Sequence, residues 1–264
     1  KLDLIAVDHP DSIDIFVDEK FSGPPFPDLK VYQVHLKQFP VSAVDKEGND
    51  VLSQITEKDD VYIASFKPDK YQGITEMKEL ILDLGEFDDT KEMFVFFQGW
   101  IFPTDASINY ALSQSEALKV VSPYIQVLNE KGEWVTAIEN LGFPMGKDKT
   151  VIADMTGKFL TGDHRIKICT NMEVYWDRIF FSTSILQTSL KNSILNPVKA
   201  DLHYRGYSRT FRKGGRYGPH WFDYSVVDKE PKWRDQSGNY TRYGEVLPLI
   251  TGIDNKYVIS NAGD

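Results

Sequence analysis

Short runs of alternating apolar and polar residues make up most of the chain, and this period-two pattern is typical of half-buried β-strands. No long segment shows the period of about 3.6 residues that marks an amphipathic helix. Helix is expected only at 105–115 and 184–196. The strand-like runs are 2–7, 12–17, 30–36, 78–84, 93–99, 150–155, 164–169 and 173–183. We therefore predict a mainly β fold, an antiparallel β-sandwich.

Two further segments have the pattern of β-hairpins. Residues 41–52 are centred on Asp45-Lys46-Glu47-Gly48, and residues 124–135 are centred on Asn129-Glu130-Lys131-Gly132. A type I turn followed by glycine in the left-handed region reverses the chain in this way. The shared turn chemistry predicts two hairpins but is too short to indicate an internal repeat.

Residues 76–184 form the best-defined module of the sequence. The module opens with the apolar run 80–84 and closes with the aromatic-rich run 173–181. This arrangement resembles the jelly-roll sandwich of galactose-binding-like domains, a resemblance that implies a fold rather than a function. The N-terminal β-rich segment, 1–75, and the loop-rich C-terminal β segment, 185–264, are expected to pack around it as extra strands or as a second small lobe.

Large apolar groups occur on both faces of the predicted strand 173–183, so we expect both faces to be covered. Strict alternation places Tyr175, Asp177 and Ile179 on one face and Trp176, Arg178 and Phe180 on the other. A buried charge without a partner is strongly unfavourable. Asp177 and Arg178 should therefore each pair with a neighbouring strand or loop.

The net charge of −9 makes nucleic acids and anionic membrane surfaces poor partners. The segment 203–217 departs from this trend, because it interleaves basic with aromatic residues in the manner of some single-stranded nucleic-acid sites. Pairing with the protein's own acidic residues is the preferred interpretation. No apolar run approaches the roughly 20 residues that a membrane-spanning helix needs. We expect neither a nucleic-acid partner nor a membrane span.

Metal and redox chemistry have little support in the sequence. Cys169 is the single cysteine, so it cannot form an internal disulfide, and its apolar surroundings predict burial. The five histidines lack the spacing of a transition-metal site. Asp83, Asp88 and Asp89 could contribute to a structural Ca²⁺ site, although a solvated acidic turn is the preferred interpretation. No other cofactor is predicted.

Carbohydrate binding needs flat apolar faces for the sugar ring and planar polar groups for its hydroxyls. The candidate ligand-binding residues on this basis are Trp100, Asp105, Asn109, Asn171, Trp176, Asp177, Arg178 and Trp221. Asp105 and Asp177 are also the first candidates for a glycosidase carboxylate pair. The alternatives are structural: tryptophans in strands are commonly core residues, and Asp105 is placed to cap a short helix.

Six short segments resemble the C-terminal region of large bacterial FG-GAP (integrin-type propeller) repeat proteins, some of which also carry the ASPIC-UnbV domain of cartilage acidic protein. They are 7–10, 99–105, 142–146, 154–157, 170–178 and 240–244. The resemblance implies an exported, interaction-based protein and supplies no catalytic residues. Because no propeller repeat is present, we expect a fragment or processed product with the propeller upstream.

Three functions remain open from the sequence. The leading hypothesis is a non-catalytic structural or protein-interaction module of a larger exported or cell-envelope protein, in contact with upstream domains of the same polypeptide or with a larger assembly. The second is a carbohydrate-binding module, and the third is a glycan-active enzyme. Exposed tryptophans around a pocket would favour the second and a close carboxylate pair the third, whereas aromatics buried in the core would leave the first.

Overall fold

The computed structural model describes residues 1–24, 26–64, 66–146, 148–186, 190–212, 220–230, 234 and 237–264. Of these described residues, 39% lie in strands and 6% in helices, far below the usual third for helix. The predicted mainly β fold with antiparallel sheets is confirmed, and no described sheet closes into a barrel. Two compact units divide the chain, Asp11–Gln187 and the pair of segments Lys1–Pro10 and Thr188–Asp264.

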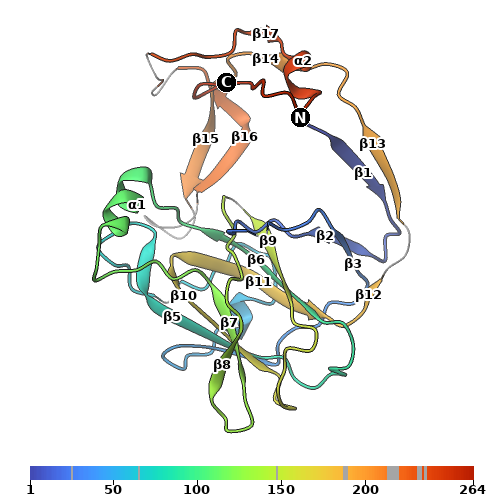
Figure 1. Ribbon diagram of the computed structural model, residues 1–264, viewed down its shortest axis with the longest axis vertical. Coiled ribbons are helices and arrows are strands. Elements are labelled where there is room, and N and C mark those ends of the chain that lie inside the picture. Colours follow the sequence, from blue (N-terminus) through green and yellow to red (C-terminus); the bar gives the residue numbers. More distant parts are fainter. Residues whose placement is uncertain are drawn as a thin grey trace. The chain divides into compact units, whose positions relative to one another are not determined.

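Three antiparallel sheets build the larger unit (Figure 1). The five-stranded sheet has the order β4 (Ser42–Asp45), β5 (Ile74–Asp83), β10 (Arg165–Met172), β7 (Tyr124–Leu128) and β8 (Trp134–Ile138). The central three-stranded sheet has the order β11 (Val174–Ser182), β6 (Phe94–Ile101) and β9 (Lys149–Asp154). The third sheet has the order β12 (Ile185–Leu186), β3 (Val31–Val34) and β2 (Asp14–Val17). Residues 11–75 thus contribute strands to the same unit as 76–184.

The central sheet is covered on both faces. On one face, residues such as Phe97 and Ile179 pack against Leu82 and its neighbours in the five-stranded sheet, forming the main core. On the other, Phe96 and Phe180 stack with ring centroids 4.7 Å apart, beneath residues of β2 and β3. Burial of each such side chain contributes about 1.5–3 kcal/mol. The prediction that strand 173–183 is covered on both sides is confirmed.

A β-bulge changes which residues of β11 share a face. The register with β6 shifts between Trp176 and Arg178, because Asp177 is an extra residue in the bulged strand. Trp176 and Ile179 consequently both belong to the main core. The predicted strict alternation is therefore wrong beyond Trp176.

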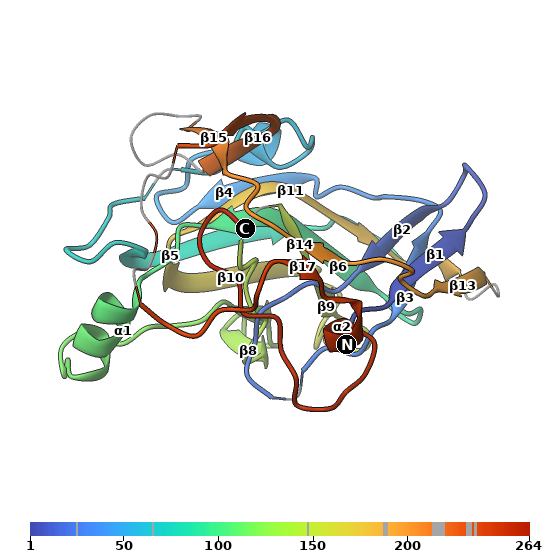
Figure 2. The ribbon, with the colours of Figure 1, turned by 90° about the horizontal axis from the view of Figure 1, so that it is seen from above.

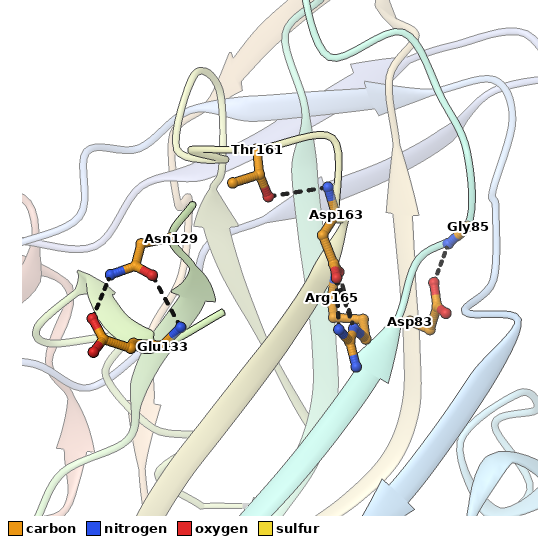
Figure 3. Close-up of polar contacts among 7 residues, drawn as sticks. All are labelled: Asp83, Gly85, Asn129, Glu133, Thr161, Asp163 and Arg165. Atoms are coloured by element: carbon orange, nitrogen blue, oxygen red, sulfur yellow. Dashed lines mark hydrogen bonds and ion pairs between the residues drawn. The ribbon is translucent and has the colours of Figure 1, made fainter. Parts of the chain in front are cut away.

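Both hairpin turns have the predicted geometry. Gly48 and Gly132 adopt positive φ values of 82° and 76°, and each amide donates to a carbonyl three residues earlier. Figure 3 shows how Asn129 stabilises the second turn, with its Oδ1 accepting from the Glu133 amide at 3.0 Å. After the first turn the chain makes an isolated bridge at Asp50 and enters the 3₁₀ helix η1 (Leu52–Gln54), so it forms only a short hairpin.

Short ribbons make up the smaller unit (Figure 2). They pair β1 (Leu4–Asp8) with β13 (Lys191–Leu195), β14 (Asp201–Leu202) with β17 (Gly244–Glu245), and β15 (Tyr207–Arg212) with β16 (His220–Asp228). Helix α2 (Leu247–Ile250) follows β17 in the chain. All three hydrophobic core clusters of the described chain come from the larger unit. Within the part of the chain that the structure describes, no helix is long and apolar enough to cross a membrane.

The predicted helix at 184–196 is wrong. Its first residues form β12, which pairs with β3, and its later residues form β13, which pairs with β1. The segment has no apolar stripe at helical spacing, so pairing with existing strands is the more favourable arrangement. Residues 187–189 lie outside the described residues.

Candidate functional site

Two of the predicted ligand-binding tryptophans lie in the core. Trp100 is 5% exposed and packs against Phe102 and Tyr175 at centroid distances of 5.6 and 5.7 Å. Trp176 is also 5% exposed and belongs to the main core, 5.5 Å from Phe97. Neither ring offers a flat face to solvent.

Asp105 and Asn109 lie at the start of helix α1 (Ala106–Ser113), on the surface. Asp105 Oδ1 accepts hydrogen bonds from the Ile108 amide at 2.8 Å and the Ser107 hydroxyl at 2.6 Å. These bonds lower the pKa of the Asp105 carboxyl. Asp105 is thus the helix N-cap that the sequence predicted, and Asn109 accepts from the Thr104 hydroxyl at 2.7 Å.

The buried side chain of Asn171 hydrogen-bonds β10 to a neighbouring loop. Its Oδ1 accepts from the Val121 amide at 2.7 Å, and its Nδ2 donates to the Lys119 carbonyl at 2.8 Å. Both ends of the side-chain amide are therefore occupied by backbone. Such pairing satisfies buried polar groups and leaves little capacity for a ligand.

Asp177 and Arg178 find separate partners on neighbouring segments, as the sequence predicted. Asp177 Oδ1 accepts from the amides of Asp59 and Asp60 at 3.2 Å each, whereas its buried Oδ2 has no hydrogen-bond partner. Burial raises the pKa of Asp177 to about 6, and the nearby Asp60 and Asp148 add to the increase. Arg178 Nε donates to Gln98 Oε1 at 2.7 Å.

Trp221 lies in β16, but its side chain falls outside the described residues. The remaining seven candidates do not gather around one cavity. Trp176 is the one among them that lines the cavity described below. Sequence reasoning therefore identified residues of structural importance, but it did not identify a common site.

The acidic turns also make internal contacts. Asp83 Oδ1 accepts from the Gly85 amide at 2.9 Å (Figure 3), and Asp88 accepts from the Thr90 hydroxyl at 2.6 Å. Asp89 lies 3.8 Å from His164 Nε2. Over the described ranges, no group of three or more His, Cys, Asp or Glu side chains is arranged to share a metal ion.

A cavity of about 40 Å³ lies where β10 ends and β11 begins. Its apolar wall is formed by Ile63, Phe66, Leu80, Ile168, Val174 and Trp176. A buried water needs about 10–15 Å³ in the same measure. The cavity therefore has room for about three waters or for a small organic molecule.

Lys78 supplies the amine in the wall of this cavity. Its Nζ donates to the Val174 carbonyl at 3.1 Å and lies 4.1 Å from the centroid of the Phe66 ring. Burial lowers the pKa of the Lys78 ammonium to about 7, although the charge of Glu173 opposes the decrease. No ion pair joins Lys78 to any carboxylate of the described residues.

Glu173, 3% exposed, provides the nearby acid. Its Oε1 accepts from the Tyr175 hydroxyl at 2.6 Å, and its Oε2 accepts from the Gly73 amide at 3.2 Å. Burial raises the pKa of Glu173. Of these groups only Lys78 lines the cavity; Glu173 acts on Lys78 through its charge, and Tyr175 is hydrogen-bonded to Glu173.

Sequence reasoning missed this group, although a signal was present. Position 78 shares the parity of Leu80 and Leu82, which face the core. A lysine at a core-facing position is unusual, so this pattern in the sequence indicates that Lys78 is a candidate functional residue.

Comparisons with known protein families, with curated proteins and with solved structures find no match. Function must therefore be inferred from the residues of the chain itself.

Proposed function

We propose that the chain is a non-catalytic structural and protein-interaction module of a larger exported or cell-envelope protein. The supporting observation is the smaller unit, which combines short ribbons with exposed apolar side chains and whose described residues contribute to none of the three core clusters. The exported location is supported by the resemblance to FG-GAP repeat proteins.

The β1–β13 ribbon provides the clearest interaction surface. Leu4 pairs with Leu195 and Ile5 with Ile194, and all four side chains are exposed, Ile194 by 67%. A two-stranded ribbon alone is marginally stable in water. Each strand pairs only with the other among the described strands, so each has an open backbone edge.

The partner that fits this ribbon is an extended protein segment carrying apolar side chains. Such a segment would hydrogen-bond to an open edge and cover the apolar side chains, as in β-strand addition. Because these side chains are 40–67% exposed, covering one of them completely would contribute about 1–2 kcal/mol. An upstream domain of the same polypeptide or another subunit of an assembly can supply the segment.

A matched pair of variants tests whether the ribbon is a free surface. Ile194→Ser should leave the free energy of unfolding within about 0.5 kcal/mol, because an exposed side chain loses few contacts. Ile179→Ser, at a residue that is 0% exposed, should cost about 3 kcal/mol or more. A loss of stability for Ile194→Ser as large as that for Ile179→Ser would mean that the ribbon is already covered, and would contradict the proposal.

Carbohydrate binding is a second candidate, favoured by the exposed aromatic pair Phe222 and Tyr224 on β16. Their rings stack with centroids 6.0 Å apart and an interplanar angle of 23°, and Tyr224 is 65% exposed. Flat adjacent rings can stack on sugar faces. Tyr224→Ala should then abolish glycan-array signals, whereas Tyr110→Ala, at a tyrosine that is 71% exposed, should retain them. The absence of any glycan signal from the unaltered chain would exclude this candidate.

The enzyme hypothesis gains no comparable support. Of the two carboxylates suggested by the sequence, Asp105 caps a surface helix and Asp177 is buried in the bulge of β11. Neither lines the cavity beside Lys78.

A further inference from the structure

Lys78 occupies a position that would ordinarily hold an apolar residue. Its neighbours at the same parity of β5, Leu80 and Leu82, belong to the main core. Lysine nitrogens in such positions are normally paired with a carboxylate or reach solvent. Lys78 is partly buried, and its Nζ atom donates to the Val174 carbonyl and lies over the face of Phe66.

The charged groups around the cavity are predominantly acidic. Asp45, Lys46, Glu47, Glu76 and Glu79 line it together with Lys78, and Glu173 interacts electrostatically with the lysine. A negatively charged ligand would be repelled by these carboxylates. A neutral molecule that becomes positively charged on binding to Lys78 would be stabilised by the charge of Glu173, which favours the ammonium form of this lysine, and by the face of Phe66.

We propose that Lys78 is a covalent binding site for a small, uncharged carbonyl compound such as a short-chain aldehyde. The neutral amine attacks the carbonyl carbon and forms a C–N bond. The carbonyl oxygen leaves as water, giving an imine that takes up a proton to become an iminium cation. The apolar wall accommodates the alkyl group, and the volume of about 40 Å³ suits an alkyl group of a few carbon atoms.

The lowered pKa makes this reaction feasible at neutral pH. With a pKa of about 7, about half of Lys78 is neutral at pH 7. An exposed lysine with the ordinary value of about 10.4 is neutral in roughly one molecule in 2,500. A less basic amine is also a weaker nucleophile, so the rate advantage is smaller than this ratio.

Reductive trapping on the full chain tests the proposal without a variant that could fail to fold. Limiting propanal and cyanoborohydride, which reduces the iminium to a stable propyl amine, are added at pH 7, and modified lysines are quantified by peptide mass mapping. Lys78 should react at least about tenfold faster than the exposed Lys131 and Lys158. Its rate should fall about tenfold between pH 7.5 and pH 6, since the neutral fraction falls by nearly that factor.

A charged probe supplies the control. Glyoxylate has a similar size but carries a carboxylate, so its preference for Lys78 over Lys131 should be several times weaker than that of propanal. Modification of Lys78 no faster than the exposed lysines, or an equal preference for glyoxylate, would overturn the proposal.

Discussion

At the scale of single residues, Asp177 has the most unusual environment of the predicted candidates. Its Oδ1 is held by two backbone amides, while its buried Oδ2 is without a hydrogen-bond partner. Desolvation, together with the negative charges of Asp60 and Asp148, favours the protonated carboxyl. The folded state is therefore more stable when the Asp177 carboxyl is protonated and neutral.

This environment predicts a pH-dependent stability. The pKa of Asp177 is raised from about 3.9 in the unfolded chain to about 6 in the folded protein. The folded state thus binds more protons between these values, and the contribution of Asp177 to stability is lost as pH rises from about 4 to about 6. The amount is about 3 kcal/mol.

Asp177→Asn, which mimics the neutral carboxyl, should be more stable than the unaltered chain at pH 7.5 by about 2–3 kcal/mol and about equal to it at pH 3.5. Asp177→Ala should be less stable by a few kcal/mol at both, because the amides of Asp59 and Asp60 lose their acceptor. Urea unfolding at the two pH values measures both effects. Equal destabilisation by Asn and Ala would show that the charge itself is required.

The sequence predicted individual residues where the chemistry is local. Asp105 as a helix cap and Gly132 in a turn follow from residue type and immediate neighbours. The parity of Lys78 with Leu80 and Leu82 is also a local signal, but its approach to Glu173 is not, because the two residues come together only when β5 pairs with β10.

At the scale of elements, the bulge in β11 depends on a close approach of β6. Gly99 pairs with Trp176 beside the bulge, and an added Cβ at Gly99 would collide with the Tyr175 carbonyl. Only glycine leaves room for the bulged backbone there.

Gly99→Ala should therefore reduce the free energy of unfolding by about 1–3 kcal/mol or more, as overpacking in a buried sheet does. Gly162→Ala is the matched control, since nothing lies within 4 Å of its added Cβ. Chemical unfolding of the two variants gives the comparison. Equal stability of both would mean that β6 and β11 are less closely packed than described.

Most strands of the larger unit could be predicted, since alternation and turns are local signals. The bulge could not, because strict alternation continues through the sequence at Trp176-Asp177-Arg178 while the backbone does not. The prediction of a helix at 184–196 is wrong for a similar reason. The partners of β12 and β13 are β3 and β1, more than 100 residues away in the chain, and no local pattern identifies them.

At the scale of the whole molecule, the two units differ in how they are stabilised. The larger unit has a central sheet buried on both faces, whereas the smaller unit consists of ribbons whose apolar side chains remain exposed. Local stability follows the number of buried apolar contacts. We therefore expect the smaller unit to open independently of the larger one.

Amide hydrogen exchange on the isolated full chain tests the proposed function most directly. The amides of β1 and β13 should exchange through local opening, with protection far below that of β6 and β11, whose exchange should require global unfolding. This result is expected of a ribbon that needs a protein partner to become stable. Protection of β1 and β13 equal to that of β6 and β11 would show that the ribbon is stable without a partner and would contradict the account.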